Sequence, residues 1–282
     1  MRHSSIGIGI GLMALVGIAS AQTISDFTLT SGTASYSERN LQGPNNGTDL
    51  GLADFSIGGA PDNMFQNWWW YHTATTAREA GLGEQTFGVS NGNSARLVYV
   101  QNGGPNLPDT LQFDLEYTLT QLTSQSAAVQ IVWKVHNLAN VAQEMSFFSY
   151  ADFDVAGSAS GDTGTFTAPN QFTIDDSGYS ASYIASSTGL VGAEQGAYAS
   201  ILGRLTDSDQ DTLINGPGSF GPGDWTGGFQ WDFTLAANGT PNGADQFVGT
   251  VVKVINTPVP EPASMIALAL GASGILARRR KR

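Results

Sequence analysis

The sequence predicts an all-β protein in which two antiparallel sheets pack face to face, as in a β-sandwich or jelly roll. Many short segments alternate apolar and polar residues with a period of two, which is typical of strands with one buried face. The breaks between these segments are rich in Gly, Asn, Pro and Asp, which favour turns. Within the domain, only Thr73–Leu82 is expected as a short helix. Helices therefore do not alternate with strands, as they would around a parallel sheet.

The N-terminus has the features of a secretory signal peptide. A short polar start precedes the apolar run Ile6–Ile18, and Ala19-Ser20-Ala21 is a small-residue cleavage pattern. We expect residues 1–21 to be removed, which leaves Gln22 as the first residue. Residues 22–257 are expected to form one β-sandwich domain, because all-β folds of this size often count as a single domain.

Four consecutive aromatic residues, Trp68-Trp69-Trp70-Tyr71, are the most unusual local feature. On a strand, Trp68 and Trp70 face one side while Trp69 and Tyr71 face the other. One pair could stack on a flat ligand such as a sugar ring. In the favoured interpretation both pairs are buried, because large aromatic side chains more often belong to a core.

Two neighbouring segments predict a long antiparallel hairpin. Leu111–Thr120 alternates strictly between apolar and polar residues. In Val129–Val135 every second residue is apolar, with Gln130 and Lys134 facing the other way, and the polar segment Gln121–Ala127 separates the two. Further strands are expected at Phe27–Ser37, Phe65–Thr73, Ala95–Gln101, Glu144–Val155, Thr163–Asp175, Tyr179–Ala185, Ala197–Arg204, Gly228–Ala236 and Gln246–Ile255.

Asp207, Asp209 and Asp211 alternate like the first ligands of a calcium-binding loop of the EF-hand or dockerin type. The pattern departs from such a loop at two positions, because Thr212 replaces its glycine and Gly218 its bidentate glutamate. Calcium is the cofactor that this motif predicts. The alternative is a solvated acidic turn.

A second acidic group surrounds the end of a predicted strand. Asp152 and Asp154 lie at that end, and Asp162 follows the small-residue loop 157–161. These carboxylates could also hold an ion.

Residues 258–282 fall into three parts, namely the motif Pro260-Glu261-Pro262, the uncharged run Ala263–Ala277 and the basic end Arg278-Arg279-Arg280-Lys281-Arg282. A helix over the uncharged run would be about 22 Å long, which is shorter than the roughly 30 Å of a hydrocarbon core. The basic end favours the cytoplasmic side of a membrane. This three-part order resembles the PEP-CTERM sorting signal of exported bacterial proteins.

The resemblance implies export by the secretion machinery and transient anchoring in the inner membrane by the C-terminal helix. It further implies processing by an exosortase-type protease and release to the cell surface or extracellular matrix. An ordinary C-terminal membrane anchor is the alternative. The resemblance covers only the tail, so it says how the protein travels and not what its domain does.

The composition excludes some functions. The chain has 12 Lys and Arg and 24 Asp and Glu, and without both terminal segments 6 basic and 23 acidic residues remain, a formal charge of −17. Nucleic acids and anionic lipids require clustered basic residues, so neither is expected as a partner. The chain has no cysteine, which excludes disulfides and thiolate chemistry.

Signals of catalysis are weak. His72 and His136 are the only histidines outside the signal peptide, and neither has metal-ligand spacing to another histidine. We therefore expect a non-catalytic surface protein with a structural, adhesive or glycan-contacting role, whose partner could be extracellular polysaccharide. A secreted carbohydrate-active lyase or hydrolase on a jelly-roll scaffold is the alternative. A lectin-like or ice-binding module is a third.

Overall fold

A computed structural model describes residues 22–42, 49–102, 109–168, 170–214, 216 and 218–258. The predicted signal peptide lies outside the described residues, as do the Pro260-Glu261-Pro262 motif, the apolar run and the basic end. Within the described residues, no helix is long and apolar enough to span a membrane.

The structure consists almost entirely of antiparallel strands in two sheets. In the order of the first sheet, its main path is β1 (Asp26–Ser31), β2 (Ala34–Arg39), β3 (Leu52–Ile57), β4 (Gln66–Thr73), β10 (Gln143–Phe153), β16 (Trp225–Leu235) and β14 (Leu190–Ala197). The short strand β5 (Ala80–Gly81) pairs with β4 and brings this sheet to eight strands.

The second sheet has nine strands, in the order β15 (Ser219–Gly223), β11 (Asp162–Ala168), β12 (Gln171–Asp176), β13 (Tyr179–Ala185), β17 (Gln246–Asn256), β9 (Ser126–Asn137), β8 (Asp109–Thr123), β7 (Ser94–Asn102) and β6 (Glu84–Asn91). Three short helices complete the described structure, namely η1 (Val155–Gly157), α1 (Ser200–Thr206) and η2 (Pro241–Gly243).

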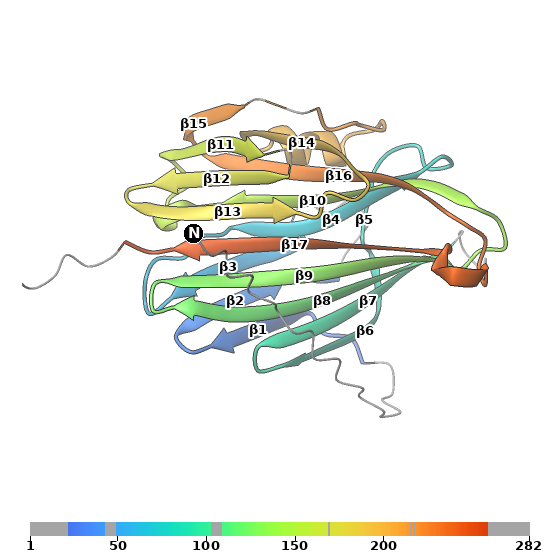
Figure 1. Ribbon diagram of the computed structural model, residues 1–282, viewed down its shortest axis with the longest axis horizontal. Helices are drawn as coiled ribbons and strands as arrows, with labels where there is room; N and C mark the ends of the chain where they lie inside the picture. Colours follow the sequence, from blue (N-terminus) through green and yellow to red (C-terminus); the bar gives the residue numbers. More distant parts are fainter. Residues whose placement is uncertain are drawn as a thin grey trace, which may run out of the picture.

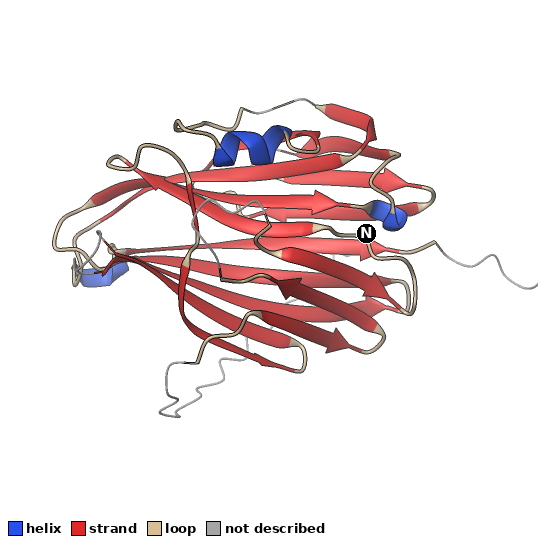
Figure 2. Ribbon diagram, turned by 180° about the vertical axis from the view of Figure 1, so that it is seen from behind, coloured by secondary structure: helices blue, strands red, loops and turns tan. Residues whose placement is uncertain are grey.

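The two sheets form the layers of a sandwich, and the strand axes of one layer are roughly aligned with those of the other (Figures 1 and 2). Aromatic side chains from both layers meet between them. The ring of Trp133 on β9 lies 4.8 Å from that of Phe147 on β10 and 5.0 Å from that of Trp231 on β16. The predicted fold class is therefore confirmed.

The predicted hairpin is also confirmed. β8 and β9 pair antiparallel, with Leu115 opposite Trp133. The residues on the alternating apolar face of both strands are buried, from Leu111 to Leu119 on β8 and from Val129 to Val135 on β9, which places them on the inner face. The period-two pattern thus identified both the strands and the face that packs on the other sheet.

Three predicted elements were wrong in form. Ala197–Arg204 is not a strand, because β14 ends at Ala197 and α1 follows. The helix buries Ile201, Leu202 and Leu205, and residues four apart share one face of a helix. Two predicted long strands are hairpins instead. Phe27–Ser37 falls in the hairpin β1–β2, and Thr163–Asp175 falls in the hairpin β11–β12.

The predicted helix at Thr73–Leu82 is also absent from the structure. The backbone N–H of Thr76 donates to the carbonyl of Thr73 and closes a turn, and the Thr76 hydroxyl donates to the same carbonyl. The chain then returns as β5 along β4, where the backbone N–H of Leu82 donates to the carbonyl of Trp69. Pairing with an available strand therefore prevails over local helix propensity here.

Candidate functional site

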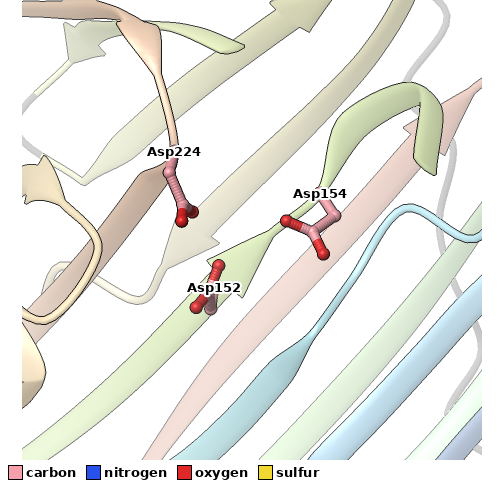
Figure 3. A group of neighbouring side chains, drawn as sticks. All are labelled: Asp152, Asp154 and Asp224. Atoms are coloured by element: carbon pink, nitrogen blue, oxygen red, sulfur yellow. The ribbon is translucent and has the colours of Figure 1, made fainter. Parts of the chain in front are cut away.

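Three carboxylates converge at the end of β10 (Figure 3). Asp152 is the second-last residue of β10, Asp154 directly follows that strand, and Asp224 lies between β15 and β16. Each offers one oxygen, and these oxygens lie within 4.8 Å of one another. Among the described residues, no other group of three His, Cys, Asp or Glu side chains brings its ligand atoms so close. We call Asp152, Asp154 and Asp224 the Asp cluster.

Strand pairing explains the convergence. Asp152 and Asp154 are two residues apart at the end of an extended segment, where alternate side chains share a face. Asp152 is in register with Thr226 of β16, and Asp224 stands two residues before Thr226. Asp152 and Asp154 belong to the predicted second acidic group, whereas Asp224 does not, because only the β10–β16 register brings it close.

Asp162, the third residue of the predicted second acidic group, lies at the start of β11 and is fully buried. Neither of its carboxylate oxygens has a hydrogen-bond partner among the described residues, and the same holds for Oδ1 of Asp152. Asp152 Oδ2 accepts a hydrogen bond of 3.5 Å from the Tyr150 hydroxyl. Buried polar groups usually have partners, so these oxygens indicate a missing donor or ion.

The electrostatics of the site point the same way. Burial raises the pKa of Asp152 to about 8, and the nearby charges of Asp154 and Asp224 add to the rise. Burial and the charge of Asp154 likewise raise the pKa of Asp162 to about 8. The backbone N–H of Trp225 partly opposes this rise, although it does not meet the geometry of a hydrogen bond to the carboxylate. Burial also raises the pKa values of Asp154 and Asp224.

This donor set fits a hard divalent cation. Ca²⁺ takes oxygen ligands at about 2.3–2.6 Å, so two ligands of one ion lie at most about 5 Å apart. The spacing within the Asp cluster meets this condition. None of the ion pairs among the described residues involves the cluster or Asp162, so no Lys or Arg of that part balances their charge.

The predicted calcium loop has a different geometry. The backbone N–H of Asp209 donates to a carboxylate oxygen of Asp207, whereas the Asp211 carboxylate accepts a hydrogen bond of 2.9 Å from Arg204. Asp207, Asp209 and Asp211 do not form a group of converging ligand atoms. Calcium binding by this loop remains a prediction.

The aromatic run lies in β4, and its four side chains are at most 2% exposed. Trp69 stacks on Phe147 with 5.3 Å between ring centroids, and Trp70 packs edge-on against Tyr150 at 5.8 Å. Trp68 and Tyr71 are equally enclosed. The geometry therefore favours the interpretation as core, because a sugar ring could not reach these faces.

The two histidines lie on different sheets, His72 on β4 and His136 on β9. His72 Nε2 is 3.8 Å from a carboxylate oxygen of Glu79, and burial lowers the pKa of His72. His136 Nε2 is 3.2 Å from Asp245 Oδ2.

No curated protein is significantly similar to this chain in sequence. Among solved structures, a bacterial glucoamylase complexed with acarbose is 12% identical, over 89% of this chain and 36% of its own, with a TM-score of 0.48. This chain therefore spans about a third of that protein. A putative aldose 1-epimerase from Escherichia coli K12 is 11% identical over 82% of this chain and 98% of its own, with a TM-score of 0.41. At these values the similarities carry no functional argument.

The C-terminal tail gives a definite match. Residues 258–281 match the PEP-CTERM protein-sorting motif. The match begins two residues after β17 ends and includes Pro260, Glu261 and Pro262 together with Arg278–Lys281. The segment that follows the β-sandwich is therefore a PEP-CTERM sorting motif, the tag of proteins that exosortase-type systems process and export.

Proposed function

We propose that this protein is a non-catalytic component of the cell surface or extracellular matrix, whose β-sandwich is stabilised by a calcium ion held by the Asp cluster. The sorting motif supports the destination. The buried, unpartnered oxygen of Asp152 at the point where three carboxylates meet carries the calcium site. An extracellular protein meets enough free calcium to fill a site of modest affinity.

The ion would act on the fold rather than on a substrate. It would join the end of β10, the segment before η1 and the β15–β16 connection. Asp162 lies close enough to influence the pKa of Asp152 and would add its charge to the field at the ion. A matrix protein with this device could present its outer sheet faces to polysaccharide as a rigid support.

Thermal unfolding with and without calcium tests the site. Calcium at about one hundred times its Kd stabilises a folded protein by about 2.7 kcal/mol. For a protein of this size, the melting temperature measured in calcium should exceed that in chelator by about 5–10 °C. Magnesium should do less, because it requires a tight octahedron.

Asp152→Asn should remove most of the calcium response, and in chelator it should melt no lower than the wild type, because it replaces a carboxyl whose ionised form burial disfavours. Asp209→Asn is the matched control in the exposed acidic loop and should keep the full response. If the wild type does not respond to calcium, the proposed site is wrong. If instead Asp209→Asn abolishes the response, the ion binds the 207–211 loop.

Maturation is tested by mass spectrometry of the protein secreted by its native host. The secreted form should begin at Gln22 and lack the residues that follow the Pro260-Glu261-Pro262 motif. Both ends follow from the signal-peptide pattern and the sorting motif. Recovery of intact C-terminal peptides ending in Arg282 from the extracellular fraction would contradict sorting-coupled cleavage.

A further inference from the structure

Three polar side chains meet in the core between the two sheets. Lys253 on β17 belongs to the nine-stranded sheet, whereas Glu38 on β2 and Asn67 on β4 belong to the other. All three are 0% exposed. Lys253 Nζ donates to Asn67 Oδ1, and Asn67 Nδ2 donates to Glu38 Oε1. We call Lys253, Asn67 and Glu38 the Lys–Asn–Glu triad.

Each member of the triad occupies a position where the strand pattern calls for an apolar residue. Lys253 alternates in phase with the buried residues Val251 and Ile255 on β17. Glu38 is likewise in phase with buried Tyr36 on β2. The domain between the terminal segments has only two lysines, Lys134 and Lys253, so burying one of them is costly and calls for an explanation.

The surroundings keep the triad dry and close to neutral. The hydroxyl of Tyr117 donates to Glu38 Oε2 at 3.1 Å, and that of Tyr36 donates to Glu38 Oε1. The Lys253 amine lies 5.3 Å from the centre of the Tyr183 ring. Burial lowers the pKa of Lys253 to about 7, while burial raises the pKa of Glu38 to about 7. A neutral amine beside a protonated carboxyl is therefore accessible near neutral pH.

A neutral amine in contact with a side-chain amide is a nucleophile beside an electrophile. Nζ touches the carbonyl oxygen of Asn67, which places it next to the carbonyl carbon Cγ. Glu38 contacts the nitrogen that would leave. Such fixed contact replaces a bimolecular encounter with an intramolecular one.

We propose that Lys253 and Asn67 form an intramolecular isopeptide bond, with Glu38 as the proton shuttle. The lone pair of Nζ attacks Asn67 Cγ, and a new C–N bond forms. The protonated Glu38 gives its proton to Nδ2 and takes one from the attacking nitrogen, so it ends the step protonated as it began. The Cγ–Nδ2 bond then breaks, and Nδ2 leaves as ammonia. The step exchanges one amide for another, so it needs no oxidant, metal or external reactant.

The position of the bond would make it an effective staple. It would join the two sheets through residues that are 186 positions apart in the sequence. Closing so long a segment strongly restricts the unfolded chain, as a long-range disulfide does. The chain has no cysteine with which to form a disulfide. Because the triad is buried, water that could hydrolyse the new amide is excluded.

Peptide mapping of the full-length protein, expressed with its own signal peptide and recovered after export, tests the proposal. Trypsin normally cuts after Arg39, Arg78, Arg204 and Lys253. In the cross-linked protein Lys253 is modified, so trypsin should leave it uncut. The digest should contain a branched peptide that joins residues 40–78 to the peptide beginning at Leu205, with a mass lower than the sum by about 17 Da, that of one ammonia.

Intact mass alone does not decide, because Gln22 at a new N-terminus also loses ammonia by cyclisation. The branched peptide is the decisive product. Recovery of residues 40–78 and 205–253 only as separate linear peptides would overturn the proposal.

Three variants separate the roles. Lys253→Arg should yield linear peptides only, because a guanidinium is not nucleophilic. Glu38→Gln retains both reacting groups and should lose most of the branched peptide, whereas full cross-linking of this variant would overturn the assignment of Glu38. Asn67→Asp should lose water instead of ammonia and give a branched peptide of the same mass as the wild type. Failure of that variant to cross-link while it remains folded would contradict attack at Cγ.

Discussion

Phe113→Asp is expected to abolish the folded state. Phe113 lies on the inner face of β8, where its ring is 4.8 Å from that of Tyr71 and 5.6 Å from that of Phe147. The substitution removes these contacts and buries a carboxylate without a partner. The expected cost is on the order of 4 kcal/mol or more, a large part of the stability of an ordinary domain. Circular dichroism and thermal melts measure it.

Asp114→Leu is the matched control on the neighbouring residue. Asp114 points to the outer face and is only 3% exposed there, because Arg96, itself 47% exposed, covers it with hydrogen bonds to both carboxylate oxygens. With leucine at this position, water can still solvate the guanidinium of Arg96, so we expect the free energy of unfolding to fall by only about 1 kcal/mol. Equal losses in the two variants would mean that the assigned inner face of β8 is wrong.

In the presence of a chelator, the protein should be less stable at pH 7 than at pH 5. The pKa values of Asp152 and Asp162 are raised to about 8 in the folded state, against roughly 4 in an unfolded chain. The folded state therefore binds more protons between these values, and stability falls as the pH rises through this window. If the folded state holds two more protons than the unfolded chain over these two pH units, the free energy of unfolding falls by about 2–5 kcal/mol. The upper figure is the limit for two carboxyl groups that titrate independently.

Urea unfolding at the two pH values measures this loss. Asp152→Asn combined with Asp162→Asn should make the dependence shallower, and calcium should make it shallower in the wild type by keeping the carboxylates ionised. Glu38 and Asp62, each with a pKa raised to about 7 by burial, add a loss of the same sign. Lys253 does not change charge between pH 5 and 7 in the unfolded chain, and its folded pKa of about 7 affects only the end of the window. A pH dependence as steep in the double variant as in the wild type would mean that other groups control it.

The sequence was most informative where one face of a strand is wet. Leu111–Thr120 alternates because its outer face meets water, so its strand, pairing and inner face could all be predicted. Strands such as β14 (Leu190–Ala197) and β15 (Ser219–Gly223) were missed, since glycine-rich segments carry little alternation. The helix α1 was read as a strand because it is only seven residues long.

The candidate sites depend on pairings that the sequence does not display. Asp224 joins Asp152 only through the register of β10 with β16. The signal for the Lys–Asn–Glu triad was present, because Lys253 interrupts the apolar face between Val251 and Ile255. Its partners could not be identified, since Asn67 and Glu38 lie on strands of the opposite sheet.

The place of β17 determines how the molecule would carry a mechanical load. β17 pairs on one side with β9 along its whole length and on the other with β13. The sorting motif starts two residues after β17 ends. A tether attached there pulls along the strand axis, perpendicular to the ladder hydrogen bonds, so many bonds resist together in shear rather than opening one at a time as at a sheet edge. Tension at the C-terminus would therefore spread through the middle of the nine-stranded sheet before any strand could peel away.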